Sequence, residues 1–311
     1  MNEMTGKEFS IPSGSPEMSV SKKSGLFQTM LSALIYGFTP TICSVTYALG
    51  NNHTSMTFFR NLLILPAVIL IIAGKKIDLR LSRIELLKIL ILANLGTLMT
   101  TLLLYSSYRF ITVGMATTIH FMYPILVIVF CRIFYRETIT KKKMLSIALA
   151  FMGIVFFLLA NRSGSVSGIL LAFSSGITFA LYLMLLDKWG LSEINSFKFI
   201  FYTSGIAVTE MFLADVRQKF ILFAQPAGVY ALMFIVAMLA SLIAAVCLKE
   251  GVRILGSTTA SFISLLEPIS SVAFGAILLK ERVSFLEILG CISVILSILN
   301  LIKDGKELNK R

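Results

Sequence analysis

Apolar residues follow one another in long, continuous runs along most of the chain. A helix needs about 20 such residues to cross the hydrocarbon core of a bilayer. Ten runs of roughly that length can be counted: Leu26–Leu49, Met56–Ile72, Leu86–Tyr108, Val113–Phe134, Met144–Ala160, Ser167–Leu186, Phe199–Ala214, Gly228–Leu248, Leu255–Leu279 and Phe285–Ile302. Polarity does not alternate within them, which favours helices over the strands of a membrane barrel. The pattern predicts an all-α polytopic membrane protein with ten transmembrane helices.

The composition agrees with this class and leaves little room for any other domain. Of 311 residues, 57% are hydrophobic and 14% are charged, whereas soluble domains are about half apolar and about a quarter charged. Ten crossings use about 200 residues, so only short loops and tails remain. The sequence contains neither a G-x-x-x-x-G-K-[ST] loop nor an H-E-x-x-H zinc motif. We therefore expect no enzymatic activity, no catalytic residues, no cofactor and no metal.

The four cysteines lie in or beside the apolar runs and form no C-x-x-C pair. They are Cys43, Cys131, Cys247 and Cys291. Free cysteine in such a setting behaves as a small buried apolar residue. We expect no disulfide or metal role for them.

Lysine and arginine are distributed unevenly between alternate loops. If the N-terminus is cytoplasmic, the cytoplasmic segments hold 21 of these residues and the outer segments hold 6. Basic residues mark the cytoplasmic side of membrane proteins, so the net charge of +12 needs no nucleic-acid partner. We expect a multi-pass protein of the cytoplasmic cell membrane with both termini in the cytoplasm.

The chain repeats itself once. Shifting it by 144 residues places Ala116 on Ala260 and Pro124 on Pro268, and a shift of 139 places Gly37 on Gly176. Each repeat would contain five spans, and an odd number of spans inverts the second repeat relative to the first, as in many secondary transporters. The predicted organisation is a disordered cytoplasmic tail (1–24), a first repeat (25–161), an inverted second repeat (162–303) and a cytoplasmic C-terminal tail (304–311).

Two copies of one motif carry a resemblance to a known family. They are Ala116…Pro124…Arg136-Glu137 and Ala260…Pro268…Lys280-Glu281, joined by Phe58-Phe59-Arg60 in the second span. Over roughly residues 25–302 the chain resembles the EamA branch of the drug/metabolite transporter superfamily in its ten-span, two-repeat form. Three positions depart from the repeat or from the family pattern: Ser146 stands opposite Gly290, Ser297 stands opposite Gly153, and His120 is unusual in the fourth span.

Glu267 is the first candidate for a functional role. It lies near the middle of the ninth span, where a carboxylate is costly unless it is paired, hydrated or protonated. Pro268 removes the hydrogen bond to the carbonyl of Ser264, and a free carbonyl beside an acid would suit a cationic group. The alternative is that Glu267 braces the helix break by accepting hydrogen bonds from a neighbouring helix.

His120 is the second candidate, because histidine can exchange protons near neutral pH. We expect His120 and Glu267 to face one central cavity, with one of them carrying a coupling proton. An interhelical hydrogen bond is the alternative role for His120. Further candidates for substrate binding or coupling are Tyr123, Ser264, Ser261, Thr117, Tyr36 and Tyr182, and candidate helix-bending residues are Pro40, Pro124 and Pro268. The serines share one helix face, which can equally serve close helix packing.

Arg60 lies about one turn into the second predicted span from its outer end. Its side chain would then reach outward to the membrane surface. The alternative is a gate or a clamp for a substrate carboxylate.

Taken together, these features predict a secondary transporter that works by alternating access. It would move a small polar metabolite, and the resemblance implies export of a compound such as an amino acid, with proton coupling as an option. The alternatives are a drug or organic-cation exporter, a lipid or lipid-linked sugar flippase, and a passive channel. The expected partners are a small-molecule substrate, the lipid bilayer and protons. The sequence leaves the oligomeric state open.

Overall fold

All regular elements in residues 16–160, 165–278, 280 and 283–308, which the computed structural model describes, are helices. In chain order they are α1 (Pro16–Ala48), α2 (His53–Leu62), α3 (Leu65–Lys75), α4 (Arg83–Leu92), η1 (Ala93–Met99), α5 (Thr100–Ser107), α6 (Val113–His120), α7 (Tyr123–Tyr135), α8 (Lys141–Ala160), α9 (Val166–Lys188), η2 (Leu191–Glu193), α10 (Ser196–Gln218), α11 (Ala227–Val236), η3 (Ala237–Ala244), α12 (Ala245–Leu255), α13 (Ser257–Ile263), α14 (Leu266–Leu278) and α15 (Phe285–Leu308).

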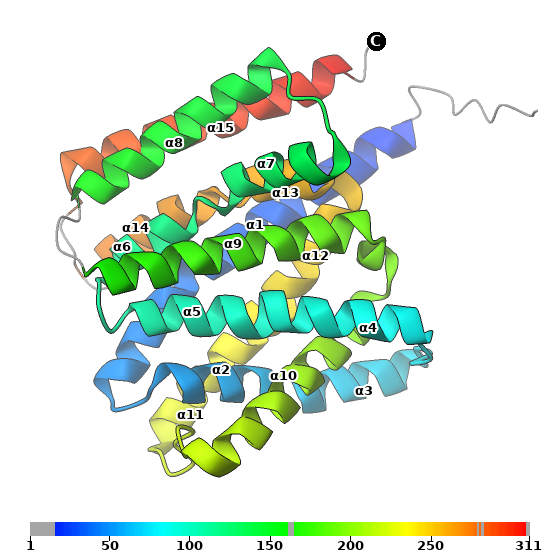
Figure 1. The fold of residues 1–311 in the computed structure, drawn as a ribbon, viewed down its shortest axis with the longest axis vertical. Coiled ribbons are helices and arrows are strands. Elements are labelled where there is room, and N and C mark those ends of the chain that lie inside the picture. Colours follow the sequence, from blue (N-terminus) through cyan, green and yellow to red (C-terminus); the bar gives the residue numbers. More distant parts are fainter. Residues whose placement is uncertain (1–15, 161–164, 279, 281–282, 309–311) are drawn as a thin grey trace, which may run out of the picture.

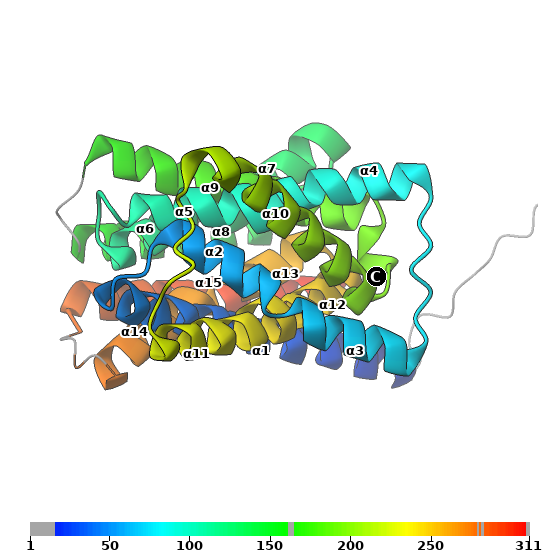
Figure 2. The ribbon, with the colours of Figure 1, turned by 90° about the horizontal axis from the view of Figure 1, so that it is seen from below.

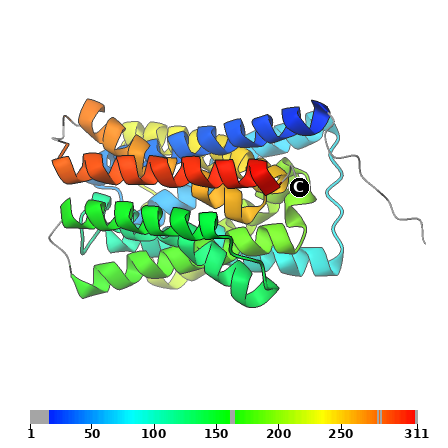
Figure 3. The same ribbon diagram turned by 90° about the horizontal axis from the view of Figure 1, so that it is seen from above.

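Ten helical stretches within the described residues are long and apolar enough to cross a membrane. They coincide with the ten predicted apolar runs, so the predicted all-α, ten-span fold class is confirmed. The helices run roughly alongside one another, and α1 begins at the same end of the bundle at which α15 ends (Figure 3). We call this end of the bundle the terminal end and the other the distal end.

The first helix begins earlier in the chain than the sequence analysis predicted. Residues 1–24 were expected to form a disordered tail, but α1 already begins at Pro16. Residues 16–24 therefore belong to helix α1, within which the apolar stretch long enough to cross a membrane begins at Lys22. Residues 1–15 lie outside the part of the chain that the structure describes.

Several spans consist of two helices with a break between them. The fourth span divides between α6 and α7, just before Pro124, and the ninth divides between α13 and α14, just before Pro268. Proline cannot donate a backbone hydrogen bond and its ring crowds the preceding turn, so a break at this place follows from the sequence. Pro40, by contrast, lies within the uninterrupted helix α1.

The third and eighth spans each contain a π-helical segment, a wider turn in which hydrogen bonds join residues five apart. These segments are η1 (Ala93–Met99) and η3 (Ala237–Ala244). Their first residues are 144 positions apart, the same shift that superposes the two proline breaks. The two repeats therefore share their irregularities as well as their sequence motif.

The two repeats are interleaved in space (Figures 1 and 2). Helix α1 of the first repeat packs against α12 and α14 of the second, and α9 of the second packs against α5 and α7 of the first. At one edge of the bundle α8 pairs with α15, and at the opposite edge α10 packs against α2 and α3. The first span of each repeat therefore packs among helices of the other repeat.

The pairing of α8 with α15 explains two of the residues that depart from the repeat. The Ser146 hydroxyl donates to the carbonyl of Ser297 over 3.1 Å, and the Ser297 hydroxyl donates to the carbonyl of Ser146 over 2.7 Å. Asn300 adds a hydrogen bond to the Ser146 hydroxyl. Both serines are fully buried. Small residues let membrane helices approach closely enough for such bonds.

Replacing Ser146 with leucine should therefore destabilise this helix pair. The larger side chain has no space at a fully buried position, and overpacking of this kind costs about 1–3 kcal/mol. We expect a lower midpoint of thermal unfolding for the purified variant in detergent. Ala148→Leu, an exposed position on the same helix, is the matched control and should leave the midpoint unchanged. Equal midpoints for the two variants would contradict the reciprocal serine contact.

Candidate functional site

A cavity of about 150 Å³ lies among the spans of both repeats. The first, second, third, fourth, sixth, seventh, eighth and ninth spans all contribute to its wall. Its polar lining residues are Tyr36, Thr39, Arg60, Asn61, Thr97, Thr100, Thr101, Tyr105, Tyr108, Thr117, His120, Tyr182, Thr203, Ser204, Ser241 and Glu267. The cavity therefore brings together polar side chains from eight of the ten spans.

Glu267 lies in the first turn of α14 and lines this cavity with 6% of its surface exposed. Its Oε1 atom accepts a hydrogen bond of 3.4 Å from the hydroxyl of Tyr123 on α7. Among the described residues it forms no ion pair within 4.0 Å. A carboxyl group is thus held at membrane depth with a neutral donor from the other repeat.

One expectation about this helix break is wrong. The carbonyl of Ser264 was expected to be free, because Pro268 cannot donate to it. Instead it accepts the backbone N–H of Glu267 over 2.9 Å, since the break tightens into a turn with bonds between residues three apart. The Ser264 hydroxyl also turns away, donating to the carbonyl of Ala260. Ser264 therefore offers no free carbonyl for a cationic group.

Two repeat-equivalent glycines bring the first span of each repeat against the break in the other repeat. A Cβ atom on Gly37 would lie 2.5 Å from the carbonyl oxygen of Glu267, and one on Gly176 would lie 3.0 Å from the carbonyl oxygen of His120. Neither approach would be possible with a larger residue. The glycines thus hold α1 and α9 against the segments that carry the two titratable residues.

His120 is the last residue of α6 and also lines the cavity. Its Nδ1 atom lies 2.9 Å from the Ser175 hydroxyl on α9. That hydroxyl donates its own proton to the carbonyl of Ala172, so it must accept from His120, which places the proton on Nδ1. The Nε2 atom is left as an acceptor. The interhelical hydrogen bond considered for His120 is therefore present, alongside its position on the cavity.

An aromatic cluster surrounds His120. Phe179 of α9 lies between Tyr123 and Tyr182, with ring centroids 4.7 Å and 5.7 Å away, and its ring is nearly parallel to that of Tyr182. The His120 ring lies 5.3 Å from Tyr123. Tyr123 thus contacts His120 with its ring and Glu267 with its hydroxyl, linking the two titratable residues.

Arg60 points into the cavity and does not reach outward to the membrane surface. Helix α2 begins at His53, three residues before the predicted start, so Arg60 lies two turns inside the span. Its Nε donates to the Ser241 hydroxyl over 2.8 Å, and one terminal nitrogen donates to the Tyr105 hydroxyl over 3.0 Å. Ser241 belongs to η3. The π-helical turn of the eighth span thus supplies a partner for the arginine of the second span.

The cavity collects many of the predicted residues, though not all. Those that line it are Glu267, His120, Thr117, Tyr36, Tyr182, Pro40 and Arg60. Tyr123 is buried behind Glu267. Ser261 and Ser264 are fully buried and bond to carbonyls of their own helix, and Pro124 and Pro268 lie at the breaks without reaching the cavity.

The sequence analysis missed the contribution of the third, seventh and eighth spans. Thr97, Thr101 and Tyr108 line the cavity from η1, α5 and the residue just after α5. Together with Tyr105, these three residues recur every three or four positions. They therefore form a polar stripe along a mainly apolar run. That stripe was the signal that could have identified them.

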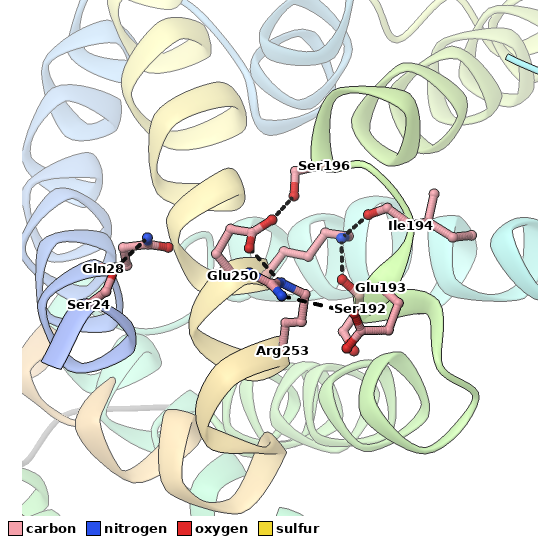
Figure 4. A network of polar contacts seen from close by, with 9 residues as sticks. Ser24, Gln28, Ser192, Glu193, Ile194, Ser196, Glu250 and Arg253 are labelled. Carbon is pink, nitrogen blue, oxygen red and sulfur yellow. Dashed lines mark hydrogen bonds and ion pairs between the residues drawn. The ribbon is translucent and has the colours of Figure 1, made fainter. Parts of the chain in front are cut away.

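At the terminal end of the bundle, polar contacts join α12 to the connection from α9 to α10. Lys249 is 2% exposed and donates to the carbonyls of Ser192 and Ile194. Figure 4 shows the adjoining contacts, in which Glu250 joins Ser196 at 2.7 Å and Arg253 at 2.7 Å. We call Lys249, Glu250 and their partners the terminal latch.

Two further contacts join elements at the same end. Asp187 accepts hydrogen bonds from the backbone and the hydroxyl of Ser257, at the first residue of α13. Lys188 forms an ion pair of 2.6 Å with Glu137, just beyond the end of α7. The end of α9 is therefore tied to both repeats.

Removing the buried lysine should loosen the terminal latch. Lys249→Met keeps the side-chain volume but leaves the carbonyls of Ser192 and Ile194 without their charged donor. We expect backbone amides of residues 190–195 to exchange hydrogen about tenfold faster or more, as measured by mass spectrometry. Lys23→Met, an exposed lysine in α1, is the control. Unchanged exchange in Lys249→Met would mean that the lysine does not hold this connection.

Comparisons with known proteins agree with this architecture. The chain matches the EamA-like transporter family twice, over residues 23–159 and 166–302. It is 31% identical over 88 residues to the uncharacterized transporter YcbK of Bacillus subtilis (strain 168), a match that spans 27% of this chain and 28% of YcbK. A protein of known crystal structure shares the fold with a TM-score of 0.73 at 13% identity, over 92% of this chain and 99% of the other.

The two family matches fall on the two sets of five spans described above. They also confirm the resemblance inferred from the paired Pro124 and Pro268 motifs. Because they cover most of the chain, this protein belongs to the EamA-like transporter family of the drug/metabolite transporter superfamily.

Proposed function

We propose that this transporter exports a small polar metabolite, such as an amino acid, across the cytoplasmic membrane by alternating access coupled to protons. The observation that carries the proposal is the pair Glu267 and His120, both on one cavity at membrane depth. Ionisable residues are costly there and are characteristic of substrate routes and proton relays.

The size of the cavity supports a small substrate. Its volume of about 150 Å³ is below the roughly 300–1,000 Å³ of pockets that take drug-sized ligands. Its wall carries threonine, serine and tyrosine hydroxyls as well as three ionisable side chains. These features favour a small polar metabolite over a drug or a lipid.

Tyr123 supports a role for Glu267 in proton coupling. The Tyr123 hydroxyl is its neutral donor, and no basic residue within ion-pair distance is described for it. A carboxyl group without a fixed cation can bind a proton or a cationic substrate in turn, which is the exchange that a coupled carrier requires. His120, linked to it through the ring of Tyr123, offers a free Nε2 acceptor for the same proton.

The interleaved repeats support alternating access between two mixed bundles. One bundle would contain α1, α12 and α14, and the other α5, α7 and α9, because α1 packs against α12 and α14 and α9 packs against α5 and α7. The terminal latch joins them at the terminal end. Opening toward that end would require the latch to break while the contacts at the distal end form.

The first test measures transport by purified protein in liposomes. Labelled amino acids, nucleosides and organic cations are offered with and without an imposed pH gradient. We expect saturable transport of an amino acid that the pH gradient stimulates, and loss of that stimulation in Glu267→Gln. Glu210→Gln is the matched control, since Glu210 bonds to Asn94 and lines a separate groove outside the cavity. Saturable transport that neither pH nor Glu267→Gln alters would leave a facilitator with a structural Glu267.

The second test concerns His120. Glutamine can keep a hydrogen bond to Ser175 but cannot carry a proton. We expect His120→Gln to fold normally and to lose most of the pH dependence of transport. His53→Gln, which changes the other histidine, should behave as wild type. Full transport with an unchanged pH profile in His120→Gln would remove His120 from the coupling mechanism.

A further inference from the structure

We propose that the cavity binds a substrate that carries both a carboxylate and an ammonium group, with the carboxylate held by Arg60, Tyr105 and Tyr108 and the ammonium group held by Glu267. This inference rests on the proposed transport function and names the chemical class of its substrate. The three donors of the carboxylate site are called the anion subsite below.

Arg60 is a cation without a carboxylate partner among the described residues. A guanidinium group has five N–H groups in a rigid fork that matches a carboxylate. Ser241 and Tyr105 take up two of them, and the side chain is only partly buried because it opens on the cavity. A permanent charge at this depth needs a counter-charge. An anionic group of the substrate can supply this counter-charge.

Two tyrosine hydroxyls beside Arg60 are also available as donors. The oxygen of Tyr105 accepts from Arg60 and, over 3.7 Å, from the thiol of Cys43, so its own proton remains for a further acceptor. The hydroxyl of Tyr108 is buried with no hydrogen-bond partner in the described protein, and Tyr108 lines the cavity. A buried unpartnered hydroxyl is costly unless a ligand satisfies it. The anion subsite therefore presents donors only.

Glu267 provides the opposite charge at a separate place in the same cavity. Arg60 and Glu267 line this cavity together with Tyr36, and the two charged groups form no ion pair within 4.0 Å of each other. A substrate with an ammonium group and a carboxylate can offer a counter-charge to each of these two groups within the one cavity.

Substrates with one charge fit less well. A purely cationic molecule would leave the Arg60 fork and the Tyr108 hydroxyl without an acceptor, and a purely anionic one would leave Glu267 without a cation. Unsatisfied buried polar groups discriminate strongly between otherwise similar ligands. The apolar part of the molecule can lie on the nearly parallel rings of Phe179 and Tyr182, which line the same cavity.

The test compares an amino acid with its two single-charge analogues. The amino acid that wild type transports best is used with its amide, which lacks the carboxylate, and its deaminated acid, which lacks the ammonium group. Binding is measured as the ligand concentration that raises the thermal unfolding midpoint of purified protein, which does not depend on transport. We expect wild type to bind the amino acid about tenfold to a hundredfold more tightly than either analogue, from one lost charge-assisted contact in each case.

The variants assign each charge to its residue. In Arg60→Gln the amino acid should bind no better than its amide, while the amide binds as it does to wild type. In Glu267→Gln the amino acid should bind no better than the deaminated acid. Tyr108→Phe removes a hydroxyl that has no protein partner, so it should fold normally and bind the amino acid about three- to tenfold more weakly. Arg83→Gln, at an exposed position of α4, is the control.

Each outcome bears on one of the two proposals. An Arg60→Gln variant that still prefers the amino acid to its amide would overturn the anion subsite, as would wild type that binds both equally. Transport of organic cations alone would also overturn it while keeping the carrier function. Selective binding of the amino acid without transport in liposomes would overturn the proposed function and leave the subsite assignment standing.

Discussion

Inside a bilayer, every backbone and side-chain polar group must find its partner within the protein, because no water is available to supply one. The breaks before Pro124 and Pro268 create this demand at the centre of the bundle. At the second break a tightened turn at Ser264 meets it, and helices α1 and α9 approach the two breaks closely at Gly37 and Gly176. The position of Glu267 and His120 on the cavity depends on that arrangement.

The same constraint explains the hydrogen bonds that hold the helices together. Ser146 and Ser297 exchange hydrogen bonds between two spans, Ser32 donates to a carbonyl of η3, and the Ser175 hydroxyl accepts a hydrogen bond from His120. Each of these bonds joins a span of the first repeat to a span of the second. In the cavity, by contrast, Arg60, Glu267 and Tyr108 keep hydrogen-bonding or ion-pairing capacity that no described residue of the protein satisfies. Such unused capacity is what distinguishes a binding site from a packed interior.

Much of the fold was predictable because lipid imposes simple rules on sequence. Unbroken apolar runs of span length predicted the ten helices, and the 144-residue shift that places Pro124 on Pro268 predicted the two repeats. Of the site, Glu267, His120 and Tyr36 could be found as polar residues in apolar runs. Their coupling roles remain predictions.

Other features could not be derived, for physical reasons. An apolar run does not reveal which helix face meets other helices and which meets lipid, so the Thr97–Tyr108 stripe and Ser241 were missed. The π-helical turns depend on tertiary contacts and leave no periodic signature. Arg60 was misplaced because its depth depends on the start of α2, which the cap residue Asn52 sets at His53, three residues before the apolar run.

The exchange of first spans between repeats has a consequence for biosynthesis. Ser32 of α1 bonds to Ala244, which lies 212 residues later in the chain. At synthesis rates of about 5–20 residues per second, that partner emerges roughly 10–40 s after α1 does. During this interval α1 must remain in the membrane with its polar face uncovered by its final neighbours. The nascent first span therefore depends on temporary contacts, from early helices or the insertion machinery, until the eighth span arrives.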